Sequence, residues 1–269
     1  MDALREIDTW GARTAAAGVV RADAELGVHG PRDVELPWAS VTKLLTGLAV
    51  LVAVEEGTVD LDEPAGPEGS TLRHLLSHAS GLPPDEGPPL MPPARRRIYS
   101  NLGIEVGASL VAEHAAIPFG EYFRASVVQP LGLAGALHGS PAWGYLGPLD
   151  DLLALARELL APTLIAQETL DEATSVQFPG LAGVLPSFGR MDANDWGLAF
   201  ELRDHKSPHW TSVHNSQRTF GHFGAAGTFL WVDPELGSAC GVLTDKEFGA
   251  WALEAWPRFN DSVVREQRS

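Results

Sequence analysis

The fold and the candidate chemistry of this chain both depend on residues 38–57, which read WASVTKLLTGLAVLVAVEEG. Apolar side chains fill most positions after Lys43, and this pattern predicts a buried helix over residues 41–56. Gly57 follows at the place where helices commonly end with a left-handed residue. Because the apolar run from Leu44 to Val54 is too short to span a bilayer, we expect a helix inside a globular domain.

Ser40 and Lys43, at the start of this helix, are one turn apart and share a face. Lys43 is one of only three lysines among 19 basic residues. A buried lysine can lose its proton near neutral pH, whereas an arginine cannot. In one interpretation Ser40 caps the helix and Lys43 reaches water. In the other, Lys43 takes a proton from Ser40 and makes it a nucleophile, and the helix N-terminus stabilises a developing oxyanion. The spacing alone leaves both open.

Two further segments place polar groups at the ends of expected elements. Tyr99-Ser100-Asn101 lies between a Pro-rich loop and a helix expected from Leu102, so a phenol and an amide can reach a neighbouring cleft. His222-Phe223-Gly224-Ala225 ends an expected strand. There Gly224 lets the strand edge approach a ligand, and the Ala225 N–H can face that ligand.

In this order, Ser40-Val41-Thr42-Lys43, Tyr99-Ser100-Asn101 and His222-Phe223-Gly224 resemble the three motifs of serine β-lactamases and penicillin-binding proteins. The resemblance is nearest to class C β-lactamases and their esterase and D-aminopeptidase relatives, and it covers roughly residues 15 to 265. Supporting phrases are Leu75-Leu76-Ser77-His78-Ala79-Ser80-Gly81-Leu82-Pro83, Pro130-Leu131-Gly132-Leu133, Trp196-Gly197-Leu198 and Leu230-Trp231-Val232-Asp233-Pro234-Glu235.

The resemblance implies that Ser40 attacks a carbonyl carbon and becomes acylated, with Lys43 and Tyr99 sharing the role of general base. It also implies an oxyanion hole made by the backbone N–H groups of Ser40 and Ala225. Asn101 would hold either Lys43 or the substrate. The other substrate-binding residues implied are His222, Phe223 and Gly224. The implied partner is a small-molecule ester or amide, with no metal and no cofactor required.

The third motif departs from the family pattern, which usually has Lys-Thr-Gly or Lys-Ser-Gly there. His222 is largely neutral at pH 7 and Phe223 offers no hydrogen bond. Each missing charge-assisted bond to a substrate carboxylate weakens binding by about 1–3 kcal/mol. We therefore expect a carboxylesterase acting on small or medium acyl esters. The alternatives are a β-lactamase, DD-peptidase or D-amino-acid amidase, and then a non-catalytic binding protein with the same cleft.

The rest of the chain predicts an α+β fold with strands near both ends and helices between them. We expect an antiparallel sheet built from the two terminal regions, flanked by helices, with an inserted mostly helical lobe. Residues 1–269 would form one domain, with lobes 1–57 plus 209–269 and 58–208. The expected strands are 17–26, 27–36, 196–203, 219–222, 227–232 and 239–244, with a hairpin turn at 233–237. The expected helices are 2–16, 71–78, 102–115, 119–128, 149–160 and 247–259.

Composition excludes several classes of function. The net charge of −16 argues against nucleic-acid binding and against docking on an anionic membrane. Residues 1–13 contain no apolar signal core, so a cytoplasmic location is expected. Cys240 is the only cysteine and lies in an apolar run, so it is expected to be a core residue without a disulfide.

Several other residues are expected to have structural or surface roles and no part in catalysis or metal binding. His74 and His78 have a spacing that could bind zinc, but no His-Glu-x-x-His pattern accompanies them. Arg95 to Arg97 are expected on a solvated face near the cleft, and Trp231 in the core. The histidines expected in a solvated loop are His205, His209 and His214.

Overall fold

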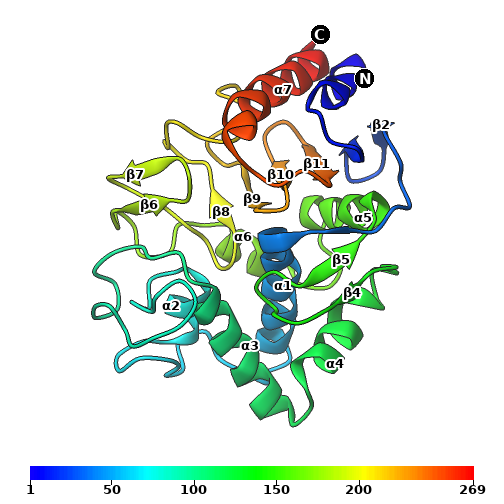
Figure 1. Ribbon diagram of the computed structural model, residues 1–269. Coiled ribbons are helices and arrows are strands. Elements are labelled where there is room, and N and C mark those ends of the chain that lie inside the picture. The colour runs from blue at the N-terminus through cyan, green and yellow to red at the C-terminus, as the bar shows by residue number, and fades with distance from the viewer.

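The computed structural model describes residues 1–269 and is centred on a six-stranded antiparallel sheet (Figure 1). The strands lie in the order β2 (Glu25–His29), β1 (Ala15–Val20), β11 (Ser238–Thr244), β10 (Thr228–Asp233), β9 (Phe220–Gly224) and β8 (Glu201–Leu202). Because β1 pairs with β11, the two ends of the chain meet in the middle of the sheet. This confirms the predicted α+β fold and the origin of its sheet.

Smaller strands and the helices complete the fold. A three-stranded sheet contains β3 (Leu36–Pro37), β5 (Tyr145–Gly147) and β4 (Ala136–Leu137), and a hairpin contains β6 (Gly183–Leu185) and β7 (Gly189–Met191). The helices are η1 (Asp2–Thr9), η2 (Ala39–Val41), α1 (Thr42–Glu55), α2 (Leu72–Leu76), α3 (Asn101–Ala115), α4 (Phe119–Phe123), η3 (Arg124–Val128), α5 (Leu149–Leu160), α6 (Gln167–Ala173) and α7 (Ala250–Arg268).

Both faces of the main sheet are covered, as the alternation of side chains along β10 shows. Phe229 and Trp231 belong to the apolar cluster under η1 and α7. Leu230 and Val232 belong to the larger cluster that contains α1 and α5. The sheet is thus the middle layer, with η1 and α7 on one face and α5 and α1 on the other (Figure 1). Trp231 and Cys240 are fully buried, which confirms their expected place in the core.

The apolar segment within residues 38–57 forms the central helix, α1. α1 is buried along most of its length and contacts α3, η3 and β9, so it joins the sheet to the helices (Figure 1). Gly57 has a φ of +72° just beyond its end, as predicted. No single helix in the structure has the length and apolar composition needed to cross a membrane.

Several predicted element boundaries differ from those in the structure. The helix expected over 2–16 ends at Thr9, because Gly11 at φ +71° turns the chain toward β1. The strand expected over 196–203 shortens to β8, because Ala199 takes a φ of +66°. The closing helix begins at Ala250 and continues to Arg268 instead of ending at 259, because its polar last turns still bury Val263 and Val264. The predicted hairpin turn at 233–237 is confirmed between β10 and β11.

Two parts of the range 58–208 lie with the sheet and not among the helices. β8 is its edge strand, and α5 packs across β1 and β11. α5 packs closely on two glycines of the sheet: a Cβ at Gly18 would lie 2.7 Å from Leu153 Cδ1, and one at Gly241 would lie 2.7 Å from Leu152 Cδ2, so either would displace a leucine side chain. The sequence pattern showed a helix at 149–160 but not the surface it covers.

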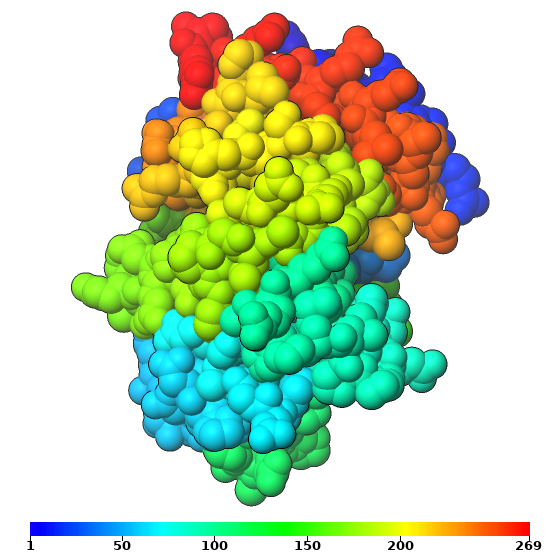
Figure 2. All heavy atoms as spheres, turned by 90° about the vertical axis from the view of Figure 1, so that its left-hand side faces the viewer, coloured from blue at the N-terminus to red at the C-terminus, as the bar shows by residue number.

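Arg97 is a correction to the expected solvated face. Of the three consecutive arginines, Arg95 and Arg96 are exposed as predicted, whereas Arg97 is buried and only 2% exposed. Its guanidinium donates to the carbonyl oxygens of Ser77 at 2.6 Å, Gln177 at 2.7 Å and Asn194 at 3.0 Å. Figure 2 shows the yellow-green segment with β6 and β7 lying against the teal loop that carries Arg97. Arg97 therefore joins three chain segments through carbonyl groups that sequence patterns do not reveal.

Replacing Arg97 by alanine should destabilise the protein by about 3 kcal/mol or more, because several buried carbonyl groups lose their donor. Arg96→Ala, at the exposed neighbouring position, is the matched control and should change stability by less than about 0.5 kcal/mol. Urea unfolding of both variants measures the difference. Equal free energies of unfolding for the two variants would contradict the structural role of Arg97.

Candidate active site

Ser40 lies in η2, a short turn anchored to the sheet immediately before α1. Ala39, the residue before it, has a φ of +46°, which is a strained conformation for a non-glycine residue. The fully buried Trp38 fixes this turn: its indole Nε1 donates to Gly147 O at 3.1 Å, and its carbonyl accepts from Thr228 Oγ1 at 2.9 Å. The turn therefore holds Ser40 at the junction of α1 and the sheet.

The Ser40 hydroxyl lies between two other side chains. Its Oγ is 3.1 Å from Lys43 Nζ and accepts a hydrogen bond from Tyr99 Oη at 2.7 Å. The residue at the N-cap position of α1 is Val41, not Ser40, and Lys43 is fully buried. Both observations exclude the interpretation in which Ser40 caps the helix and Lys43 reaches water.

Lys43 is held by two oxygen atoms besides Ser40. Its Nζ lies 2.6 Å from Asn101 Oδ1 and 2.8 Å from Ala142 O. Burial lowers the pKa of Lys43 to about 7, although the carboxylates of Glu105 and Asp85 oppose this effect. A substantial fraction of this amine is therefore neutral at pH 7 and able to accept a proton.

Tyr99 stands beside Ser40 within a group of aromatic rings. Its ring centroid is 4.7 Å from that of His78 and 5.8 Å from those of Trp196 and His222, and Lys43 Nζ lies 4.8 Å from it. Burial raises the pKa of Tyr99 above its usual value. Tyr99 is thus a protonated phenol at neutral pH, and it donates to Ser40.

Asn101 is the first residue of α3, one position earlier than the predicted helix start. Ser100 caps this helix by accepting from the Gly103 N–H at 2.9 Å, which fixes Asn101 at its first turn. The Asn101 side chain bonds Lys43 through Oδ1 and Asp85 through Nδ2. Of the two roles predicted for Asn101, the structure shows the contact with Lys43.

β9 carries the third motif to the same place. His222 is 2% exposed, and its Nδ1 is 2.6 Å from Phe223 O, so Nδ1 carries the proton. Burial, with a smaller effect of Lys43, lowers the pKa of His222 to about 3, so the ring is neutral at pH 7. A Cβ at Gly224 would lie only 2.5 Å from Trp38 O. Gly224 therefore lets β9 approach the turn that carries Ser40, and Ala225 follows at the strand end.

Phe223 does not join this group, contrary to the sequence-based expectation. Successive side chains of a strand point to opposite faces, so with His222 beside Tyr99 the ring of Phe223 lies behind the strand. It packs against Phe248 at 5.4 Å and against Trp256 at 6.0 Å between ring centroids. Phe223 is a core residue in this structure.

His78 is a neighbour of the site that sequence reasoning missed. It is buried, has a φ of +57°, and accepts from the Ser100 N–H through Nδ1 at 3.2 Å. The sequence places His78 in a family-like phrase, residues 75–83, but no pattern there indicates that its ring packs against Tyr99. His74 bonds Thr71 instead, so the two histidines have separate surroundings.

A buried ionic group lies behind Trp196 and corrects the expectation for His209. His205 and His214 are exposed as predicted, but His209 is 7% exposed and its Nε2 lies 2.9 Å from Glu201 Oε2. Glu201 also pairs with Lys206. Burial raises the pKa of Glu201, but these partners outweigh it and lower the pKa to about 2. Pairing with this carboxylate explains why part of the polar loop is buried.

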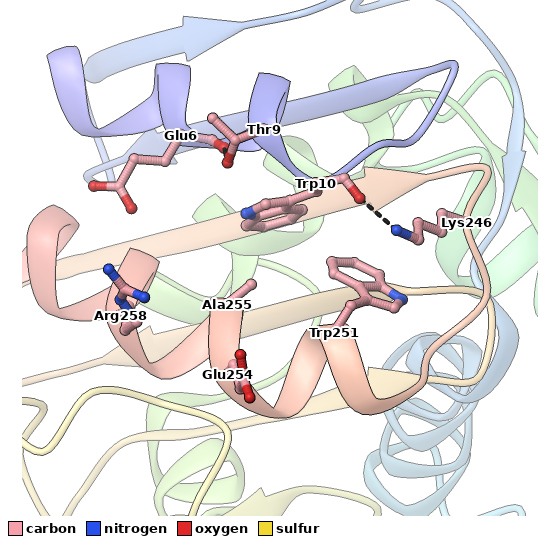
Figure 3. Close-up of a pocket in the computed structure, with 8 residues that line it drawn as sticks. All are labelled: Glu6, Thr9, Trp10, Lys246, Trp251, Glu254, Ala255 and Arg258. Carbon is pink, nitrogen blue, oxygen red and sulfur yellow. Dashed lines mark hydrogen bonds between the residues drawn. The ribbon is translucent and has the colours of Figure 1, made fainter.

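Two cavities are notable, and only the first touches this cluster. One of about 480 Å³ lies beside Tyr99, and its mostly apolar walls include Leu90, Met91, Ile98, Val184 and Pro186. Another, of about 410 Å³, lies between η1 and α7 and is shown in Figure 3. There Lys246 Nζ donates to Trp10 O, and none of the predicted site residues lines this second cavity.

Comparison with known proteins gives close and distant relatives. A family model described as Beta-lactamase matches residues 9–265. A crystal structure of a β-lactamase from Mycobacterium bovis is 47% identical, with a TM-score of 0.97 over 98% of this chain and 99% of that chain. EstCE1, a hydrolase with promiscuous acyltransferase activity, shares the fold at 16% identity and a TM-score of 0.80, over 98% of this chain and 97% of that chain. A LovD6 mutant of simvastatin synthase from Aspergillus terreus also shares the fold. It is 16% identical, with a TM-score of 0.78 over 99% of this chain and 94% of that chain.

No curated protein matches the sequence. The range matched by the family model nevertheless spans nearly the whole chain and includes all three motifs. The family model covers far more than half of the sequence, and the fold agrees with that of the M. bovis protein. This chain therefore belongs to the β-lactamase family, among proteins of the serine β-lactamase and penicillin-binding type.

Proposed function

We propose that this protein is a serine hydrolase that forms an acyl-enzyme on Ser40, and that its substrates are small or medium acyl esters. One observation carries the proposal: the Ser40 hydroxyl lies within hydrogen-bond reach of both a buried lysine and a protonated tyrosine. Membership of a family with hydrolase and acyltransferase relatives supports the reaction class. The choice of esters rests on the charge of the site.

The hydrogen bonds around Lys43 suit it to act as the base. A neutral amine has two N–H groups and one lone pair, and the oxygens of Asn101 and Ala142 occupy the two N–H groups. The lone pair is then left to accept the Ser40 proton. Tyr99 needs no ionisation in this arrangement, since its hydroxyl already donates to Ser40.

The proposed reaction proceeds through two acyl transfers. Ser40 Oγ bonds to the ester carbonyl carbon as its proton moves to Lys43. The N–H groups of Ser40 and Ala225 stabilise the tetrahedral oxyanion. The bond to the alcohol oxygen then breaks, Tyr99 gives that oxygen a proton, and Lys43 returns its own proton to Tyr99. Water repeats the sequence on the acyl-enzyme, releasing the carboxylic acid and restoring Ser40.

Charge favours uncharged substrates in this cleft. His222 is neutral where relatives of the penicillin-recognising type carry a lysine, so no cation there can bind a substrate carboxylate. The carboxylates of Asp85 and Glu105 lie close enough to Lys43 to influence its pKa, and they add negative charge. The apolar cavity beside Tyr99 offers a place for the hydrocarbon part of an ester.

A β-lactamase is the second candidate, because the M. bovis protein that shares 47% identity is named as one. The same Ser40 chemistry can open a β-lactam ring, since both reactions begin with attack on a carbonyl carbon. The two candidates differ in whether the site binds a carboxylate next to the reacting carbonyl.

Replacing Ser40 by alanine should lower hydrolysis of p-nitrophenyl butyrate by about a thousandfold or more, because the acyl acceptor is lost. Intact mass spectrometry should show a fluorophosphonate adduct on the wild-type protein and none on the variant. Ser109→Ala, a serine on the exposed side of α3, is the matched control and should keep both properties. Unchanged esterase activity in Ser40→Ala would remove the proposed function.

Activity should depend on the protonation of Lys43. Because the neutral amine is the base and its pKa is about 7, kcat/KM should be flat above that pH. Below it, kcat/KM should fall about tenfold per pH unit. Lys43→Arg should be inactive at every pH, since a guanidinium stays charged. A profile without an acid limb near pH 7 would argue against Lys43 as the base.

The esterase and β-lactamase proposals predict opposite rankings of two substrates. We expect kcat/KM for p-nitrophenyl butyrate to exceed that for nitrocefin, because nitrocefin carries a carboxylate that finds no cation at His222. Steady-state rates of both substrates at pH 7.5 and low salt provide the comparison. A higher kcat/KM for nitrocefin would replace the esterase proposal with the β-lactamase one.

A further inference from the structure

Two oxygens, Asn101 Oδ1 and Ala142 O, hydrogen-bond to Lys43. The groups that carry these oxygens are linked to carboxylates outside the three motifs. Asp85 Oδ1 accepts from Asn101 Nδ2 at 2.8 Å. Glu105 accepts from the hydroxyl of Ser140. Ser140 Oγ in turn accepts from the Ala142 N–H at 3.0 Å. Each acceptor of Lys43 is thus connected to one acidic side chain.

Asp85 determines which way the Asn101 amide faces. An ionised carboxylate only accepts hydrogen bonds, so it must face the NH2 group of the amide. The carbonyl oxygen of Asn101 is then the atom left for Lys43, at 2.6 Å. Asp85 thus uses one of the two N–H groups of the Asn101 amide and fixes the plane of that amide.

Glu105 fixes the other acceptor through the turn at residues 140–142. Ser140 donates to Glu105 and accepts from the Ala142 N–H, which orients the chain at Ala142. Thr46 Oγ1 donates to Pro141 O at 2.6 Å and fastens the same turn to α1. The Ala142 carbonyl can therefore meet Lys43 Nζ at 2.8 Å.

We propose that Asp85 and Glu105 are positioning residues, which hold the two acceptors of Lys43 so that its lone pair is directed at Ser40. This inference rests on the proposed role of Lys43 as the base. It assigns a function to two acidic residues on a loop and on α3 that no motif includes.

The two carboxylates are the charged groups that act on Lys43 from the neighbouring elements. Tyr99, His78 and His222 also face it, but burial keeps all three neutral near pH 7. Negative charge stabilises the ammonium form, so removing either carboxylate lowers the pKa of Lys43. The acid limb of the pH profile should then move to lower pH.

Two substitutions at Asp85 separate charge from orientation. Asp85→Asn can still present an oxygen to Asn101, so it should keep its maximal rate within about threefold while its acid limb moves to lower pH. Asp85→Ala frees the Asn101 amide to rotate and should lower the maximal rate by about 10- to 100-fold. Glu105→Gln should behave like Asp85→Asn. The control is Glu86→Gln, an exposed carboxylate next in the chain, which should change neither property.

Each variant is measured in two ways between pH 5 and pH 9: kcat/KM for p-nitrophenyl butyrate, and the rate at which a fluorophosphonate labels Ser40. Labelling requires an activated Ser40 but no ester turnover, so it tests the positioning role even if the ester proposal fails. Full-rate labelling of Asp85→Ala, or unmoved acid limbs in both Asp85→Asn and Glu105→Gln, would overturn the inference. Absence of labelling in the wild-type protein would also overturn it. Thermal unfolding curves confirm that the variants remain folded.

Discussion

The removal of one ammonium group from water is the constraint on which the rest of this structure depends. Lys43 is fully buried, and a charge placed there loses its hydration, so its pKa falls to about 7. The carboxylates of Glu105 and Asp85 keep the pKa from falling further. A base with a pKa near the working pH combines a useful neutral population with a real affinity for a proton.

The fold supplies this burial by bringing distant segments together around the start of α1. The sheet, assembled from both ends of the chain, contacts α1 through β9, and α3 contacts α1 as well. The turn at 140–142 reaches Lys43 directly through the Ala142 carbonyl. Gly224 and Trp38 bring β9 against the turn that carries Ser40. The rings of His78 and His222 pack against Tyr99, whose hydroxyl donates to Ser40.

Much of this could be predicted from the sequence, because the decisive residues form local patterns. The spacing of Ser40 and Lys43, the apolar helix and the order of the three motifs indicate the fold, and they single out residues that the structure brings into contact. What could not be predicted depends on contacts between distant segments. The burial of Arg97 depends on carbonyl groups of Gln177 and Asn194, far along the chain. The burial of His209 depends on pairing with Glu201, eight residues earlier, which no periodic pattern of the loop indicates. Phe223 was misassigned because a motif names consecutive residues, whereas a strand sends them to opposite faces.

Direct titration of the lysine side chains tests the central claim most simply, since the chain has only three of them. In protein labelled with carbon-13 lysine, NMR should show three Cε signals, one of which titrates near pH 7 and is missing in Lys43→Arg. The variants Lys206→Arg and Lys246→Arg assign the other two signals in the same way. If the signal assigned to Lys43 keeps the shift of a charged amine up to about pH 9, Lys43 is not the base, and the account of the site is wrong.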